Sequence, residues 1–132
     1  MRIEQAATFV MLHKHESRSP ITGQTLTEAM RVLCNREVPV SSCRFRPLPE
    51  GRLYIDALEN FLGMLMATGI VGEDEQNNIV LTEKSLRCFR RWLLDMLRDP
   101  VIRPQIIKAA EALGMTTEKL IEIAVASPAA TT

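Results

Sequence analysis

The sequence predicts a mostly helical fold with one small β-hairpin near the middle of the chain, and three observations lead to this prediction. First, apolar residues recur at helical spacing and give one segment an apolar face: Ile55, Leu58, Leu62, Leu65 and Met66. Second, β-rich runs at 70–71 and 79–81 flank a polar turn at 72–78. Third, a further helical periodicity runs from Thr82 to about Arg98.

The ends of these segments carry residues that suit their places. Gly69 follows the last periodic residue of the first helix, where a helix end often needs a left-handed backbone. Thr82 can cap the second helix, and Glu83 brings a carboxylate to the positive end of that helix. A helix over 55–68, a hairpin and a second helix are therefore expected to follow one another directly.

Four further helices are expected outside this central stretch. Apolar residues at helical spacing place them at 3–13, 24–35, 105–113 and 117–126. The segment 36–53 contains three prolines and Gly51, which do not suit a continuing helix. We interpret it as an ordered insertion in which Val38, Val40 and Phe45 form a short extended piece.

Two stretches of sequence resemble the winged helix-turn-helix superfamily. "GIV" at 69–71 with "IVLTEKS" at 79–85 resembles the wing strand and exit of such domains, and "PITGQTLTEAM" at 20–30 is similar to their short strand and second helix. The resemblance implies a winged-helix-like domain at 1–98 with extra C-terminal helices. A helical hairpin at 99–126 would pack on the domain or serve association, and 127–132 would be a flexible tail. Residues 36–53 fall outside the resemblance, because a tight turn joins the second and third helices in that family.

The composition fits a globular domain without a membrane segment. The chain has 132 residues, 46% of them hydrophobic, and its 16 basic residues balance its 16 acidic residues. A net charge of zero argues against coating nucleic acid through bulk charge, although a local basic patch remains compatible with binding. We see no signal segment and no apolar run long enough for a bilayer. Three cysteines without a C-x-x-C motif favour the reducing cytoplasm.

Arginines are the expected contacts if the chain binds nucleic acid. Arginines interleaved with aromatic residues clamp phosphates and stack on bases, and several arginines on one side of a helix can follow a phosphate backbone. The predicted nucleic-acid-binding residues are Arg44, Arg46, Arg52, Tyr54, Asn60, Arg87, Arg90, Arg91 and Arg98. The arginines of the 44–52 loop and the 87–98 helix would contact phosphates, and Asn60 would read a base.

The surface that would read DNA in this superfamily has the opposite charge. Carboxylates dominate the expected outward face of the 55–68 helix and the wing: Asp56, Glu59, Glu73, Asp74 and Glu75, with Asn60 and Gly63 between them. Carboxylates repel phosphates, so these residues favour a solvated helix face and a wing that only closes the hairpin. The segment 109–123, with Gly114 at its turn, is interpreted as a plain helical hairpin or a dimerisation element, with a second DNA-reading element as the less favoured alternative.

No catalytic or metal centre is predicted. His13, His15, Cys34 and Cys43 are soft ligands in principle, but their spacing matches no common zinc site. The chain has no Gly-rich phosphate loop, no G-x-S-x-G motif and no clear acid–base pair of carboxylates. We therefore expect no enzyme activity, no metal and no cofactor.

Two functions remain open from the sequence. The resemblance implies a DNA-binding protein, such as a transcriptional regulator, because most bacterial members of the superfamily bind DNA. The charges favour the alternative, a winged helix used for protein contact or assembly without nucleic acid. In that case the C-terminal helices would bind a protein partner or form a homodimer, and both hypotheses place the protein in the cytoplasm.

Overall fold

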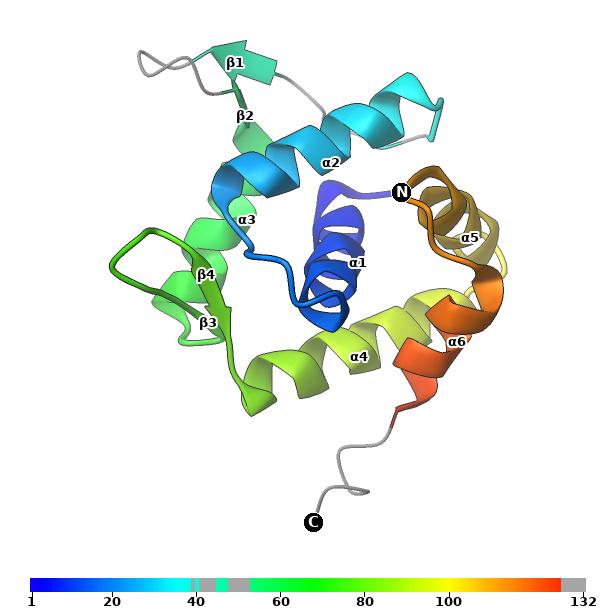
Figure 1. Ribbon diagram of the computed structural model, residues 1–132. Helices are drawn as coiled ribbons and strands as arrows, with labels where there is room; N and C mark the ends of the chain where they lie inside the picture. The colour runs from blue at the N-terminus through cyan, green and yellow to red at the C-terminus, as the bar shows by residue number, and fades with distance from the viewer. Residues whose placement is uncertain (39, 41–44, 48–52, 127–132) are drawn as a thin grey trace.

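The computed structural model describes residues 1–38, 40, 45–47 and 53–126, with the backbone alone at 45–47 and 53–55. The fold is mostly helical with small antiparallel hairpins, which confirms the predicted fold class (Figure 1). In chain order the elements are α1 (Ile3–Glu16), α2 (Gly23–Asn35), β1 (Phe45–Pro47), β2 (Leu53–Ile55), α3 (Asp56–Ala67), β3 (Val71–Glu73), β4 (Ile79–Leu81), α4 (Glu83–Arg98), α5 (Arg103–Ala112) and α6 (Thr117–Val125).

Helix α1 forms the centre of the molecule. It contacts α2, α3, α4 and α5, and Figure 1 shows these helices arranged around it. Every residue from Ala6 to Leu12 is buried, so α1 is enclosed on all sides. The sequence predicted a single apolar face and a helix that ends at residue 13. The structure extends α1 by one turn and adds Phe9 and Leu12 to the core.

The central helix–hairpin–helix stretch folds as predicted, with α3 beginning after Ile55, which lies in β2. Gly69 ends α3 with a φ of +75°, the left-handed conformation expected at that position. In the hairpin, β3 pairs antiparallel with β4 so that Gly72 lies opposite Val80. The Ile79 N–H donates a hydrogen bond to the Ile21 carbonyl, which attaches the hairpin to the segment before α2.

Ser85 joins the start of α4 to the end of α3. Its hydroxyl donates to the Ile70 carbonyl and accepts from the Thr82 N–H at 3.0 Å, while the Ser85 N–H donates to the Thr82 hydroxyl at 3.3 Å. The Ser85 side chain is fully buried. These bonds fix the direction in which α4 leaves the hairpin.

Asp74 organises the turn of the hairpin. Its carboxylate accepts hydrogen bonds from the Asn78 N–H at 2.8 Å and from the Gln76 N–H at 2.9 Å, and Asn77 takes a φ of +63°. The bond from the Asn78 N–H, supported by the Asn78 side chain and the Gln76 N–H, holds the pKa of Asp74 below its usual value. The carboxyl therefore stays ionised in the folded turn.

The segment 36–53 contains a strand that sequence reasoning did not resolve. The extended piece near Phe45 is β1, and it pairs antiparallel with β2, which then runs directly into α3. Neither Val38, which is buried in the core, nor Val40 lies in a strand, so the predicted extended piece is found only at Phe45. Residues 39, 41–44 and 48–52 lie outside the described part of the chain.

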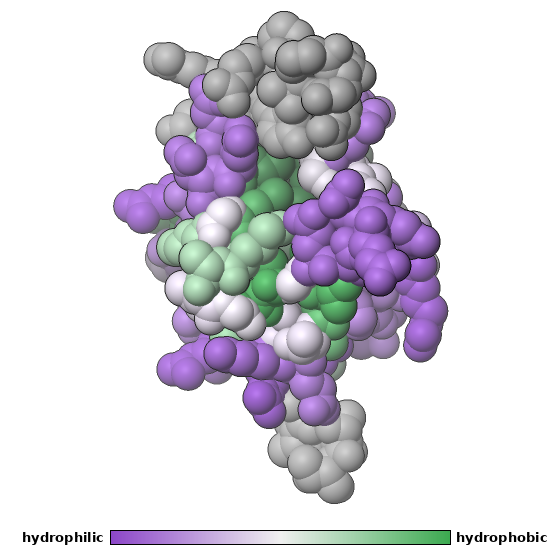
Figure 2. All heavy atoms as spheres, turned by 90° about the vertical axis from the view of Figure 1, so that its left-hand side faces the viewer, coloured by the Kyte–Doolittle hydropathy of each residue, from purple (hydrophilic) through white to green (hydrophobic). Residues whose placement is uncertain are grey.

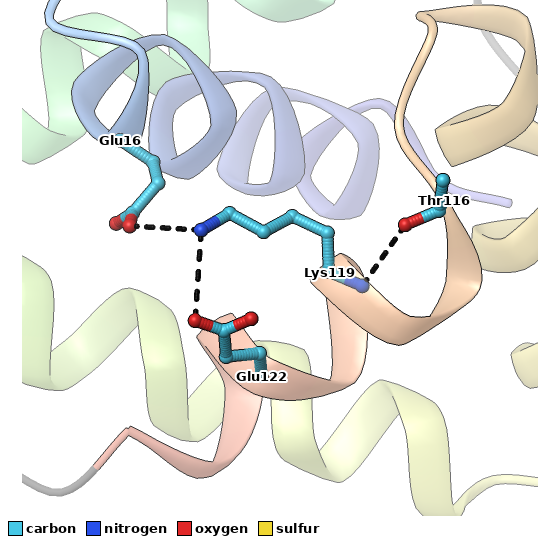
Figure 3. Close-up of polar contacts among 4 residues, drawn as sticks. All are labelled: Glu16, Thr116, Lys119 and Glu122. Atoms are coloured by element: carbon cyan, nitrogen blue, oxygen red, sulfur yellow. Dashed lines mark hydrogen bonds and ion pairs between the residues drawn. The ribbon is translucent and has the colours of Figure 1, made fainter.

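The C-terminal helices pack on the rest of the domain. Ile106 of α5 and Leu120 of α6 are fully buried, α5 contacts α1 and α2, and α6 contacts α4. The Lys119 ammonium lies 3.3 Å from Glu16 of α1 and 3.7 Å from Glu122 (Figure 3). Because these charged groups are largely exposed, apolar burial supplies most of the attachment. The predicted tail at 127–132 lies outside the described residues.

We expect His13 to make the stability of the fold depend on pH. Burial, with a smaller effect from Lys14, lowers the pKa of His13 below 6.5, and its ring stacks on Phe9 at a centroid distance of 6.3 Å. The unfolded chain therefore binds a proton at higher pH than the folded chain does. Stability should be complete above pH 6.5 and fall as the pH drops towards the folded pKa.

Urea unfolding between about pH 5 and pH 7.5 measures this dependence. His13→Gln should flatten the profile over this range, and His15→Gln, at an exposed position in the same helix, is the matched control. An unchanged profile in His13→Gln would contradict the assignment.

None of the helices in the described residues is both long enough and apolar enough to cross a membrane.

Candidate functional site: the α3–hairpin surface

The exposed side of α3 and the adjacent hairpin form the surface that corresponds to the predicted reading surface. Asp56, Glu59, Asn60 and Gly63 are exposed, as predicted, and Met64 and Ala67 are exposed beside them. We call these residues, together with 72–77 of the hairpin, the α3–hairpin surface. Met64 is half exposed, at 50%, and it is the large apolar side chain on the exposed side of α3.

The charge of this surface is uniformly negative. From Ile55 to Glu83 the chain contains no Lys, Arg or His, and it contains six carboxylates: Asp56, Glu59, Glu73, Asp74, Glu75 and Glu83. Since the whole chain is neutral, the stretch from Ile55 to Glu83 is acidic and the rest of the chain carries the compensating positive charge. A phosphate backbone laid along α3 would meet repulsion along its length.

Two hollows flank α3, and only the first has a mainly apolar lining. The first, of about 390 Å³, lies between α1, α3 and α4, and we call it the α1–α4 hollow; its lining includes Phe61, Met64, Trp92 and Met96. The second, of about 430 Å³, lies between α2, α3 and the hairpin, and polar residues, Glu59, Glu73 and Asn77 among them, line it together with apolar ones such as Leu58 and Ile79. Figure 2 views this side of the molecule, where apolar residues gather at the centre between hydrophilic ones.

Basic residues line a separate stripe on α4. Lys84, Arg87, Arg91 and Arg98 are exposed, and none of the ion pairs among the described residues involves them. At about 100° per residue, the three arginines fall within about 40° of one another around the helix. Asp95 lies among them and interrupts the positive charge.

Arg90 does not belong to this stripe, which corrects the sequence analysis. It is half-buried, and its Nε is buried without a hydrogen-bond partner among the described residues. Its position is about 100° around the helix from Arg91, on the side that turns towards the core. The sequence grouped four arginines on one face, and the structure brings three of them together.

Of the remaining predicted binding residues, Arg46 lies in β1, Tyr54 in β2 and Asn60 in α3. Arg46 is paired with Tyr54 across the β1–β2 hairpin, and only their backbone is described. Arg44 and Arg52 lie outside the described residues. Asn60 is exposed on α3, a different helix from the one that carries the arginine stripe.

Sequence reasoning missed the apolar part of the site. It placed Leu62 and Met66 in the core, whereas both are half-buried beside a hollow, and it did not consider the exposed Met64. The signal that could have found this feature is the methionine at position 64, which falls outside the apolar stripe of its helix.

No cluster of three or more His, Cys, Asp or Glu residues able to hold a metal ion occurs in the described part of the chain. Comparison of the chain with protein-family models, with curated proteins and with solved structures gave no match.

Proposed function

We propose that this chain is a winged-helix-type module that docks on another protein through the α3–hairpin surface. The observation that carries the proposal is the combination of exposed apolar area with uniformly negative charge on that surface. Two observations support the winged-helix part of the proposal. Helix α3, the β3–β4 hairpin and helix α4 follow one another in the chain, and the Ile79 N–H donates a hydrogen bond to the carbonyl of Ile21, in the segment before α2.

The exposed apolar residues favour a protein over DNA as the partner. Methionine is enriched at protein interfaces, where its flexible thioether adapts to the partner, and the exposed Met64 lines the α1–α4 hollow together with Phe61 and Trp92. The carboxylates at the edge of this surface would repel phosphates but suit a polar rim around an apolar interface.

Gly63 gives a direct test, because it lies on the exposed side of α3. A Cβ at this position meets no atom within 4 Å, so larger residues fit the folded chain. Replacing a glycine inside a helix also stabilises it, by up to about 1 kcal/mol. Gly63→Arg should therefore raise the stability of the free protein and yet block a partner through its bulk.

The measurement is the apparent mass of the full chain in native extracts of its own cells, by size-exclusion chromatography with immunodetection. We expect the wild type and Gly63→Ala to migrate in a complex and Gly63→Arg to migrate alone. A Gly63→Arg protein that stays in the same complex would contradict docking through this surface.

A homodimer through the C-terminal helices has less support. Helices α5 and α6 bury their apolar faces within the domain, and the exposed apolar residues of α6 are Ile121, at 38%, and Val125, at 61%. These two side chains offer a small area compared with the roughly 800 Å² per partner of a standard interface.

Phosphate binding by the α4 stripe is the second candidate function, and the exposure of its arginines favours it. Arg87, Arg91 and Arg98 could contact nucleic acid without involving α3 or the hairpin. This binding would be independent of sequence and would weaken steeply with salt.

We expect the double variant Arg87→Ala, Arg91→Ala to weaken binding to any duplex equally and to reduce the slope of log K against log salt by about two. Fluorescence anisotropy of a labelled duplex between about 50 and 200 mM salt measures both. If the wild type binds no duplex at the lowest salt, the second candidate is excluded.

A further inference from the structure

The α1–α4 hollow differs from the rest of the surface in the chemistry of its lining. Its walls are apolar, formed by Phe61, Met64, Trp92 and Met96 from α3 and α4. Glu4 of α1 and Asp95 of α4 also line it, and no basic residue does. Both carboxylate residues are exposed, and none of the ion pairs among the described residues involves them. A mainly apolar hollow, which Gln5 and Thr8 of α1 also line, therefore carries two carboxylates and an aromatic ring, and the nearest basic residues along α4 are Arg91 and Arg98, one turn on either side of Asp95.

Such a lining complements an apolar chain that ends in a cation. A lysine or arginine side chain has an apolar stem that packs on thioethers and a charged end that carboxylates attract. A tryptophan ring adds a cation–π contribution, and Trp gives the strongest such contact of the aromatic residues. A neutral apolar ligand would leave the two carboxylates unused, and an anion would be repelled.

We propose that the α1–α4 hollow receives a lysine or arginine side chain from a basic segment of a protein partner. The protein source of this cation rests on the proposed docking function, because Met64 belongs both to the hollow and to the α3–hairpin surface. The acidic stretch around α3, which has no basic residue from Ile55 to Glu83, would attract the rest of such a segment.

Trp92 is the only tryptophan of the chain and lines this hollow, so in the folded protein its fluorescence responds to a ligand bound there. The probe is a short helical peptide of leucine and arginine, compared with the same peptide in which citrulline, a neutral isostere, replaces each arginine. We expect the arginine peptide to change Trp92 fluorescence saturably and to bind about tenfold or more tightly than the citrulline peptide. Equal binding of the two peptides would overturn the proposal.

Neutral variants identify the carboxylates that hold the cation. Glu4→Gln and Asp95→Asn should each weaken the arginine peptide about two- to fivefold, as expected for exposed ion pairs. Glu111→Gln, an exposed change of the same charge on α5, should leave binding unchanged. An equal effect of all three variants would show that the peptide responds to the overall charge of the protein, and it would overturn the assignment of Glu4 and Asp95 as the carboxylates that bind the cation. Agmatine, a free alkylguanidinium, should bind much more weakly than the arginine peptide. Equal affinity would contradict the proposal that the cation comes from a protein partner.

The outcome separates this proposal from the docking function. If Gly63→Arg releases the native complex while the arginine and citrulline peptides bind equally, the cation site fails and docking stands. If the peptide result holds while Gly63→Arg leaves the complex intact, docking through the α3–hairpin surface fails and the hollow remains a cation site.

Discussion

Phe89→Ala is expected to lower the free energy of unfolding by about 3–5 kcal/mol, the range for truncating a buried aromatic side chain. Phe89 is fully buried in α4, the helix that packs along the central α1, and its ring lies 5.5 Å from the Trp92 ring. The truncation removes apolar burial, an aromatic contact and the support of one wall of the α1–α4 hollow. Since domains of this size are stable by only about 5–15 kcal/mol, this loss is a large fraction of the total free energy of unfolding.

Denaturant unfolding followed by Trp92 fluorescence and by circular dichroism measures this loss. Phe89→Leu keeps most of the volume and is expected to lower stability by clearly less than the alanine variant. A loss below about 1 kcal/mol in Phe89→Ala would contradict the central position of this residue.

Ser85→Ala is expected to lower stability by about 1–3 kcal/mol and to loosen the hairpin. The substitution leaves the Ile70 carbonyl without its partner and removes the hydroxyl that the Thr82 N–H uses. An unsatisfied buried carbonyl retains its desolvation penalty, which is why the expected loss exceeds that of an ordinary hydrogen bond. The amides of β3 and β4 should then exchange with solvent faster than in the wild type.

Hydrogen exchange read by mass spectrometry tests the location of this effect. Ser17→Ala is the matched control, because Ser17 is exposed and bonds only locally, to Lys14 and Ser19. It should leave both stability and hairpin exchange within error of the wild type. Faster exchange spread evenly over all helices in Ser85→Ala would contradict a specific role in holding the hairpin.

The central stretch was predictable because its signals are local. Apolar spacing defines α3 and α4, Gly69 marks the end of α3, and Thr82 and Ser85 form a capping pair at the start of α4. Each of these signals lies within a few residues of the structure that it determines, so long-range packing did not need to be known.

The elements that sequence reasoning missed depend on distant neighbours. Helix α1 is enclosed because four other helices surround it, and its own spacing shows only one strong stripe. Strand β1 ends at Pro47, and neither β1 nor β2 contains a pair of β-branched residues like the Ile–Val pairs that mark β3 and β4. Their pairing is therefore visible only once the chain is folded.

The candidate site was predicted in part. The acidic character of α3 and the hairpin follows from composition, and the exposure of Asn60 and Gly63 follows from helical spacing. Residues from three helices that are far apart in the sequence line the α1–α4 hollow, so no local sequence pattern predicts it. The misplacement of Arg90 was avoidable, because a separation of about 100° from Arg91 already puts the two residues on different sides of the helix.

Photo-crosslinking from position 60 tests most directly whether the α3–hairpin surface contacts protein. Asn60 is replaced by p-benzoylphenylalanine in the full chain, the cells are irradiated, and the adduct is treated with nuclease or with protease. The same replacement of Glu111, on the exposed side of α5, is the control. We predict that crosslinking from position 60 gives an adduct that protease digests and nuclease leaves intact. The control at position 111 should give no such adduct. A nuclease-sensitive adduct at position 60 would show that this surface contacts nucleic acid and would contradict the account.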